Sequence, residues 1–356
     1  MSSHNEQLNV DLQSSTPIPS SQSSSSTTTT TAEPSPSTRI NESTTKNTTI
    51  PNNDPFDRLS FKVGVAENKN ITFRNKMEDV HTYIANFAER IDWGYFAIFD
   101  GHAGKDTARW CGNNLHTLLE QEIDKELNQI KSNENDETVY DMQESLYKSF
   151  LKADELIEKE GVGSSGSTAA VAVLRWETND NKIIDQSQIS ISSSSSSKLN
   201  SQFDFIPTSN HKRMLYTSNV GDSRIVLCRN GQPYRLSYDH KATDINEINR
   251  IKDSNGLIMK NRVNGVLAVT RSLGDSYMKD LVIGKPFTTS TEITNEDDFL
   301  ILACDGVWDV LSDLKACNFV KEQFMAKRLC QLAMDHSTTD NVTVMIVKFD
   351  KDIFNQ

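Results

Sequence analysis

The stretch Phe96-Ala-Ile-Phe-Asp100-Gly101-His102-Ala-Gly104 decides the fold that we expect for this chain. Its four leading apolar residues predict a buried strand. The strand runs directly into Asp100, and an ionised carboxylate is costly to bury unless a positive charge meets it. Gly101 allows a sharp turn and a close approach to a ligand, and His102 is a candidate proton donor near neutral pH. A tight turn after a core strand is the plain alternative, since Asp-Gly pairs are common in turns.

The combination of an apolar run with an adjacent aspartate recurs three times, at Asp222, Asp305 and Asp340. Asp100 closes one strand and Asp340 opens another, so in an antiparallel pair both carboxylates would sit at the same edge of one sheet. Several acidic groups that meet at one edge repel one another strongly. A bound divalent cation is the usual resolution.

Composition narrows the classes of partner. The chain has 356 residues, with 37 Lys and Arg against 49 Asp and Glu, and a formal net charge of -12. This acidic balance argues against nucleic acid or an anionic membrane as the main partner. The five cysteines form no C-x-x-C pair, so neither a zinc site nor a disulfide framework is indicated.

The cysteine usage also favours a reduced intracellular compartment. No apolar run is long enough to span a bilayer. The first residues lack a secretory apolar region, and Ser2 excludes myristoylation. We therefore expect a cytoplasmic location, with the nucleus as a second compartment, and no membrane partner.

The chain divides by composition into two parts. Residues 1–54 are mainly Ser, Thr, Asn and Pro, and a segment with so few large apolar groups is expected to be a disordered tail. Residues 55–356 are expected to form the folded domain. Within them, residues 178–212 are polar and include the run Ser192–Ser197, which predicts a flexible insertion between two strands.

Helical periodicity appears in four segments of the folded part. The spacing of apolar residues predicts helices over Lys105–Gln129, Val139–Glu160, Asp244–Lys252 and Ala316–Met334. Gly161–Gly166 matches the G-x-G-x-x-G dinucleotide fingerprint letter by letter. The fingerprint must follow a strand and open a helix, whereas this match follows a helical stretch, so we interpret it as a helix stop and loop.

Eight short motifs follow one another along about residues 58 to 350. They are Arg74-x-x-Met77-Glu78-Asp79, Phe99-Asp100-Gly101-His102-x-Gly104, Gly166-Ser-Thr-Ala169, Val220-Gly221-Asp222-Ser223-Arg224, Asp239-His240-Lys241, Arg271-Ser-Leu-Gly274-Asp275, Asp305-Gly306-x-Trp308-Asp309 and Asp340-Asn341-x-Thr343. In kind and order they resemble the motif series of the metal-dependent protein phosphatases of type 2C. The chain most resembles the fungal branch that acts on stress-activated MAP kinase cascades.

The resemblance implies an α+β fold in which two packed antiparallel β-sheets are flanked by α-helices, with metals at one end of the sheets. It implies a protein serine/threonine phosphatase that uses a metal-activated water at a dinuclear Mg2+ or Mn2+ site. The expected role is a negative regulator of stress MAP kinase signalling. The expected partners are phosphorylated proteins, among them MAP kinases delivered by an adaptor, and the expected state is a monomer.

The resemblance also assigns the two tight metals. Asp100 would bridge both ions, Asp305 and Asp340 would complete one, and the Gly101 carbonyl would bind the other. Metal-bound waters would be held by Glu78 and Asp79. Ligands that are all oxygen select hard cations such as Mg2+ and Mn2+ over zinc.

The remaining roles follow from the same resemblance. Arg74 would bind the substrate phosphate, and His102 would protonate the leaving alkoxide. Asp222 and Asp309 match positions associated with a third, weaker metal. Two metals about 4 Å apart can generate a hydroxide and stabilise the entering and leaving oxygens, so no cysteine or serine nucleophile is required.

One segment departs from the family pattern. Between Asp309 and Asp340 the family has two helices separated by a short turn, whereas residues 318–334 of this chain run on without Gly or Pro. The segment therefore predicts one continuous helix that is a few residues short. This leaves the local packing, and with it the placement of Asp340, open.

Two other functions compete with an active phosphatase. A catalytically dead relative serving as a binding module would have lost one of the key aspartates, and Asp100, Asp305 and Asp340 are all present. An enzyme that forms an aspartyl-phosphate would need an Asp-x-Asp pair after the first strand, where this chain has Asp-Gly-His.

Overall fold

The computed structural model describes residues 56–132, 140–184, 202–323 and 325–355. Residues 53–356 form one compact unit, which is the subject here. The predicted tail, residues 1–54, and the serine run lie outside the described residues. Within the described part, no helix is both long and apolar enough to cross a membrane.

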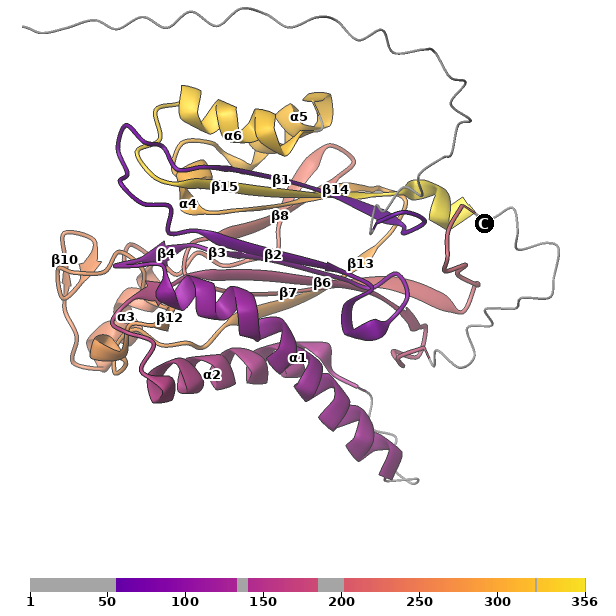
Figure 1. Ribbon diagram of the computed structural model, residues 1–356, viewed down its shortest axis with the longest axis horizontal. Coiled ribbons are helices and arrows are strands. Elements are labelled where there is room, and N and C mark those ends of the chain that lie inside the picture. The colour runs from indigo at the N-terminus through magenta and orange to yellow at the C-terminus, as the bar shows by residue number, and fades with distance from the viewer. Residues whose placement is uncertain (1–55, 133–139, 185–201, 324, 356) are drawn as a thin grey trace, which may run out of the picture. The chain divides into compact units, whose positions relative to one another are not determined.

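Two five-stranded antiparallel sheets form the centre of the domain and lie one above the other (Figure 1). The first sheet contains, in spatial order, β1 (Phe61–Asn68), β15 (Val342–Phe349), β14 (Asp297–Ala303), β8 (Arg224–Arg229) and β9 (Gln232–Arg235). The second contains β13 (Phe287–Ile293), β7 (His211–Val220), β6 (Ala169–Thr178), β3 (Gly94–Phe99) and β2 (Val80–Ala85).

Strand β3 shows why the two layers form. Alternate side chains of a strand point to opposite faces. Phe96 and Ile98 pack between the two sheets, whereas Tyr95 and Phe99 pack toward the helices on the outer face. Both faces of β3 are therefore buried, which explains why its sequence is a continuous apolar run and not an alternating pattern.

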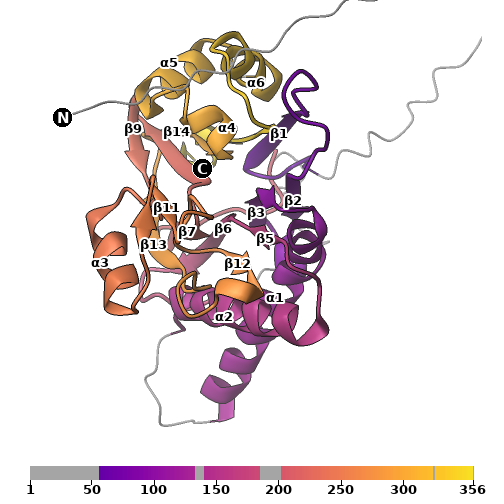
Figure 2. The same cartoon turned by 90° about the vertical axis from the view of Figure 1, so that its left-hand side faces the viewer.

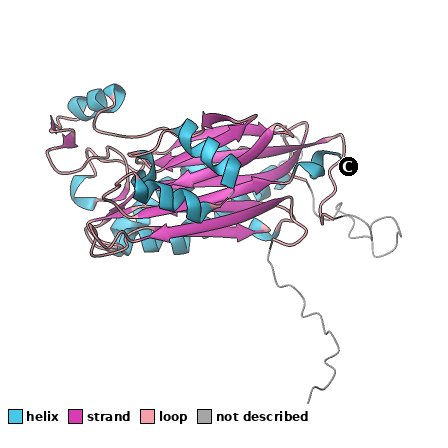
Figure 3. Ribbon diagram, turned by 90° about the horizontal axis from the view of Figure 1, so that it is seen from above, coloured by secondary structure: helices cyan, strands magenta, loops and turns pink. Residues whose placement is uncertain are grey.

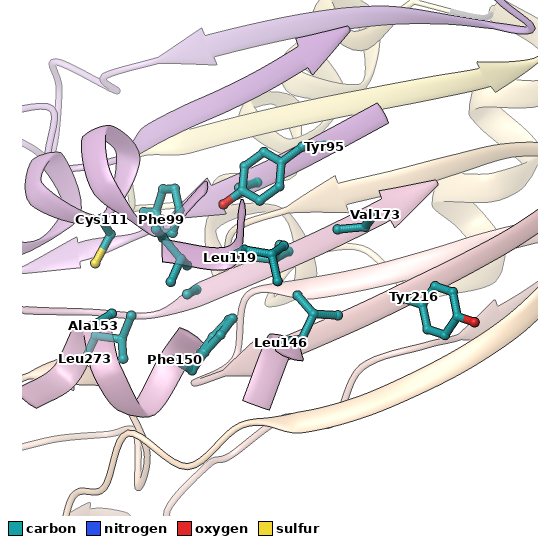
Figure 4. Packing of buried hydrophobic residues seen from close by; sticks show 14 of the residues in the cluster. Tyr95, Phe99, Cys111, Leu119, Leu146, Phe150, Ala153, Val173, Tyr216 and Leu273 are labelled. Atoms are coloured by element: carbon teal, nitrogen blue, oxygen red, sulfur yellow. The ribbon is translucent and has the colours of Figure 1, made fainter. Parts of the chain in front are cut away.

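Helices cover the outer faces of the sandwich. The second sheet is covered by α1 (Asp106–Ser132) and α2 (Met142–Glu160), whose Leu119, Leu146 and Phe150 meet the sheet (Figure 4). The Asp141 side chain caps the start of α2, and Gly161, in the left-handed conformation, ends it. The dinucleotide-like match at Gly161 is thus a helix stop, as predicted.

Two helices lie over the first sheet (Figure 3), α5 (Asp313–Gln323) and α6 (Ala326–Asp335). The prediction of one continuous helix over Ala316–Met334 is therefore wrong. Met325 adopts an extended backbone, with φ -136° and ψ 117°. The break between the helices lets Val320 of α5 and Leu329 of α6 both reach the apolar face of the sheet, so tertiary packing overrides local helix propensity.

The connection between β6 and β7 is partly packed. Phe203 and Phe205 are buried against Trp176, and the rings of Phe205 and Trp176 stack with centroids 5.2 Å apart. Two aromatic side chains of the predicted polar insertion, residues 178–212, therefore pack against the domain, and its flexibility stays a prediction. Residues 185–201 lie outside the described part of the chain.

Two short helices, a hairpin and a small sheet gather at one end of the sandwich, which we call the cleft end (Figure 2). They are α3 (Ile245–Asp253), α4 (Asp305–Trp308), the hairpin of β10 (Ile258–Met259) and β11 (Arg262–Val263), and the small sheet of β12 (Leu273–Gly274), β5 (Gly166–Ser167) and β4 (Gly101–His102). The opposite end, where β1 begins and β15 finishes, is called the far end.

Candidate metal centre

The strand directions place the aspartates around one cleft. Asp100 follows the end of β3 and Asp222 that of β7, whereas Asp305 follows β14 and Asp340 precedes β15. All four line a cleft of about 250 Å³ at the cleft end. The prediction that Asp100 and Asp340 lie at one edge of a single sheet is wrong, since β3 belongs to the second sheet and β15 to the first. The stacking of the two sheets brings them together instead.

Asp79 and Asp100 lie close together in the site. Asp79 is 1% exposed, and its Oδ2 accepts a hydrogen bond of 2.7 Å from the Thr343 hydroxyl. Its Oδ1 is buried without a hydrogen-bond partner among the described residues. Ligand atoms of Asp79, Asp100 and Cys304 lie within 4.8 Å of one another. This geometry brings a buried carboxyl group, Asp79, and a half-buried one, Asp100, close together.

The electrostatics of these carboxylates follow from burial and mutual repulsion. Burial raises the pKa of Asp79 to about 6. Burial also raises the pKa of Asp100 well above its ordinary value, and the carboxylates of Asp79 and Asp305 raise it further. Burial, followed by Asp222, raises the pKa of Asp305. A bound cation would reverse all three shifts, because it stabilises the ionised forms.

Asp305 shows the same lack of partners. Its Oδ1 is buried without a hydrogen bond from any described residue. Buried carboxylate oxygens in this state fit a group that supplies positive charge, and the oxygen donors that line the cleft fit Mg2+ or Mn2+. Burial raises the pKa of the nearby Cys304 thiol, which keeps it protonated and unsuited as a ligand. The residues around the cleft therefore fit a hard divalent cation.

Asp340 differs from Asp79, Asp100 and Asp305 because it forms an ion pair with a cationic side chain. Arg74 forms an ion pair with its Oδ2, and Arg74 Nε donates to the Thr339 carbonyl at 3.2 Å. The Asn341 backbone N–H donates to Asp340 Oδ1 at 2.7 Å. Arg74 is 43% exposed, so the side chain assigned to the substrate phosphate stands at the mouth of the cleft.

Two asparagines fix the loop that carries Arg74. Asn70 is 2% exposed and donates from Nδ2 to the carbonyls of Thr338 at 2.8 Å and Asp340 at 3.0 Å. Asn341 Oδ1 accepts a hydrogen bond of 2.9 Å from the Glu78 backbone N–H. The β1–β2 loop is thus tied to the segment before β15. Sequence reasoning missed Asn70, which belongs to none of the motifs.

Glycine is required at position 101 because the chain packs closely against the backbone of Glu78. A Cβ at position 101 would lie 2.7 Å from the Glu78 carbonyl oxygen. The chain therefore passes close to the backbone of Glu78, whose side chain is half-buried and lines the cleft. The structure thus places Glu78, Asp79, Asp100 and Gly101 side by side, as the motifs predict.

His102 is held by a residue that sequence reasoning did not assign. His102 Nε2 lies 2.7 Å from Oδ2 of Asp275, which is fully buried and adopts a left-handed backbone with φ 49°. A Cβ at Gly166 would lie 2.2 Å from His102 Nε2 and 2.1 Å from the Asp275 carboxylate. Only glycine fits there. The motif ending in Asp275 was the available signal for this contact.

Asp222 and Asp309 share a lysine. Lys241 Nζ lies 2.7 Å from Asp309 Oδ1 and 3.4 Å from Asp222 Oδ2. Asp222 is buried, whereas the Asp309 side chain is 57% exposed. Burial raises the pKa of Asp222, and Lys241 partly offsets that shift. The two aspartates assigned to a third cation thus bind the same ammonium group.

Comparison with known proteins agrees with this geometry. The family described as protein phosphatase 2C matches residues 63–184 and 192–342. The chain therefore belongs to the protein phosphatase 2C family of metal-dependent serine/threonine phosphatases. This confirms the family, the enzyme class and phosphoproteins as the class of substrate.

Two fungal relatives are similar over most of their length. The chain is 53% identical over 297 residues to Protein phosphatase 2C homolog 1 of Saccharomyces cerevisiae, covering 82% of this chain and 95% of the relative. It is 37% identical over 320 residues to Protein phosphatase 2C homolog 1 of Schizosaccharomyces pombe, covering 88% and 81%.

Solved structures support the fold. A C. elegans sex determining protein has a TM-score of 0.62 at 23% identity, covering 83% of this chain and 67% of that one. A phosphatase from a pathogenic strain of Toxoplasma gondii has a TM-score of 0.60 at 22% identity, covering 83% and 94%. The predicted α+β fold, with two antiparallel sheets flanked by helices, is confirmed.

Proposed function

We propose that this protein hydrolyses phosphoserine and phosphothreonine at a dinuclear Mg2+ or Mn2+ site in the cleft. The observation that carries the proposal is the convergence of Asp100, Asp305 and Asp340 from two sheets. Burial and repulsion raise the pKa of Asp100 and Asp305, so ionising these carboxyl groups costs free energy in the metal-free protein. A bound cation would remove this cost, because it stabilises the ionised forms.

The ligands of the ions are those that the family resemblance implies. Asp100, Asp305, Asp340 and the Gly101 carbonyl would hold the two ions. Glu78 and Asp79 hold coordinated waters. When bound, the cations supply Lewis acidity that activates water and stabilises the oxygens entering and leaving phosphorus.

The other side chains bind the phosphate and supply the proton. The Arg74 guanidinium is exposed at the cleft mouth, and its planar fork suits a phosphate group. His102 Nε2 contacts Asp275, so Nδ1 is the nitrogen that delivers a proton to the serine or threonine oxygen as it leaves. Asp222 and Asp309 take a third, weakly held cation.

A catalytically weak or dead binding module is the alternative function. Asp100, Asp305 and Asp340, the aspartates whose loss would mark a dead relative, all line the cleft, so this alternative is disfavoured. The decisive assay is hydrolysis of a phosphothreonine peptide and of p-nitrophenyl phosphate, with Mn2+ and with excess chelator. Turnover of both substrates only with Mn2+ supports the enzyme. Peptide binding without turnover would leave a binding module.

His102→Gln sharpens this assay. A general acid typically contributes about 10²- to 10⁴-fold, and it matters most for a basic leaving group. We expect a loss in this range on the phosphothreonine peptide and a much smaller loss on p-nitrophenyl phosphate, because nitrophenolate leaves without a proton. Equal losses on the two substrates would mean that His102 positions metal or water instead.

We further propose that the protein is a monomer located in the cytoplasm and nucleus. It counteracts stress-activated MAP kinase signalling, and an adaptor delivers the MAP kinases to it. The support is the motif-level resemblance to the fungal branch with that role. The test is to remove the protein from its host and follow MAP kinase phosphorylation after osmotic or heat stress. Phosphorylation that decays at the normal rate would contradict the proposal.

A further inference from the structure

Lys241 occupies the space between two carboxylates that are assigned to a cation. Its Nζ lies 2.7 Å from Asp309 Oδ1 and 3.4 Å from Asp222 Oδ2. The Asp222 side chain is 6% exposed, and that of Lys241 is 30% exposed. A buried carboxylate left without a counter-charge is costly, so in this arrangement the ammonium supplies the charge that Asp222 needs.

The backbone that carries Lys241 is fixed in place. The neighbouring His240 N–H donates to the Gly221 carbonyl at 2.9 Å, and the His240 carbonyl accepts from the Thr270 N–H at 2.9 Å. Lys241 itself forms an isolated antiparallel bridge with Val269. The segment is therefore bound directly to the residue before Asp222. Only the flexible stem of the lysine is free to carry its ammonium in or out of the pair.

We propose that Lys241 is the resident counter-ion of the third-cation position, and that the ammonium and the cation exclude each other. The inference rests on the proposed function in one respect, the use of Asp222 and Asp309 as ligands. A divalent ion bound by both carboxylates would lie within about 4 Å of the ammonium, where like charges repel. The cation binds only when the ammonium leaves, and this displacement is the cause of its weak binding.

A second lysine in the chain provides a matched control. Lys279 Nζ lies 2.5 Å from Asp154 Oδ1, and the two side chains are 19% and 15% exposed. This pair resembles the Lys241–Asp222 pair in charge and burial. Asp154 accepts a hydrogen bond from the Gly274 backbone and is not among the residues that line the cleft. Losing Lys279 should destabilise the fold without changing cation binding.

The first experiment is calorimetric titration of the full chain with Mn2+ for wild type, Lys241→Met and Lys279→Met. Methionine keeps the length of the side chain and removes its charge. In Lys241→Met we expect the weak cation to bind at least about tenfold more tightly, as removal of one like charge at this distance predicts. The two tight ions and the Lys279→Met isotherm should change by less than about twofold.

The second experiment is thermal unfolding of the same proteins in chelator and at saturating Mn2+. Without metal, both variants should unfold at a lower temperature than wild type. At saturating Mn2+, Lys241→Met should unfold at the same temperature as wild type, because the cation replaces the missing ammonium. Lys279→Met should still unfold at a lower temperature than wild type. A weak site whose affinity is unchanged or lower in Lys241→Met, or an unfolding temperature of Lys241→Met that stays below that of wild type at saturating Mn2+, would overturn the inference.

The titration also separates this inference from the proposed function. If Asp222→Ala leaves the weak site intact, the assignment of Asp222 to the third cation is wrong, and the inference falls with it. If Asp222→Ala abolishes the weak site but Lys241→Met leaves its affinity unchanged, the proposed ligands stand. Only the mutual exclusion of Lys241 and the cation is then refuted.

Discussion

The two ends of the sandwich bury aspartates in opposite ways. At the far end, Asp92 is 1% exposed and accepts hydrogen bonds of 2.7 Å from both the Ser60 backbone and hydroxyl and from Trp176 Nε1. It also forms an ion pair with the buried Arg213. At the cleft end, Asp79 and Asp305 each keep a buried oxygen without a partner among the described residues.

The paired carboxylate at the far end stabilises the folded state, whereas the clustered carboxylates at the cleft end destabilise it in the absence of metal. At the far end, strands of both sheets meet through a network that bonds both carboxylate oxygens of Asp92, since Ser60 precedes β1 and Trp176 lies in β6. At the cleft end, the packing of the sheets brings Asp79, Asp100 and Asp305 close together, and none of the three forms an ion pair with a described residue. Sites that violate the rules of stable burial are typically functional. The unpaired end is therefore the reactive one.

The largest expected effect comes from removing charge at the cleft end. Asp100→Asn and Asp305→Asn should each reduce kcat by about 10³-fold or more, because a catalytic metal supplies several kcal/mol of stabilisation. The metal-free variants should unfold at the same or a higher temperature than wild type, since a repelling carboxylate is gone. Assays at saturating Mn2+, with unfolding in chelator, check both parts. Near-normal turnover would refute the metal assignment.

The converse is expected at the far end. Asp92→Ala leaves Arg213 buried without its partner, and breaking such a pair costs about 3–5 kcal/mol of the free energy of unfolding. Urea denaturation measures the loss. The control is Asp204→Ala, which breaks the exposed pair with Arg58 and should cost less than about 1 kcal/mol. Equal losses in the two variants would contradict the contrast between the two ends.

The ends should also differ in their response to pH. In metal-free protein, burial raises the pKa of Asp79 to about 6 from the ordinary 3.8, so between these values the folded state binds more protons than the unfolded state. The free energy of unfolding should then fall as pH rises through this window. Asp79 alone accounts for on the order of 3 kcal/mol.

Urea denaturation in chelator across this pH range measures the slope. Asp79→Asn should flatten the slope, and saturating Mn2+ should remove it, because a cation keeps the carboxylates ionised in the folded state. A slope that Mn2+ leaves unchanged would place its origin outside the cleft.

The smallest effect is expected at Asp222. Asp222→Ala should lower kcat by about tenfold, corresponding to roughly 1.4 kcal/mol, and leave the two tight ions and the KM for substrate unchanged. Its unfolding temperature should change little, since a weakly occupied site adds little stability by mass action. Metal titration beside kinetics tests this. Normal turnover, or loss of the tight ions, would show that Asp222 is structural.

Sequence reasoning reached the residues of the cleft end because they sit in short motifs. Asp100, Asp305 and Asp340 each adjoin an apolar run, and that local pattern can be read directly from the sequence. It could not reveal that Asp100 and Asp340 come from different sheets. Pairing between strands far apart in the chain depends on packing that no local pattern records.

The same limit explains what was missed. Asn70 acts through carbonyls more than 260 residues away, and Asp275 reaches His102 across 173 residues. At the far end, Asp92 belongs to none of the motifs, and its partners lie at the ends of three different strands. The break before Met325 was hidden because it contains neither Gly nor Pro.

The long β6–β7 pair has a consequence for how a partner could work on this enzyme. The end of β6, the start of β7 and residues 351–355 lie at the far end (Figure 1), about 30 Å of strand from the cleft at roughly 3.3 Å per residue. A label or fused domain attached there leaves the cleft open. A scaffold grafted to that end would act as a tether, and its linker length would set the effective concentration of phosphoprotein at the cleft.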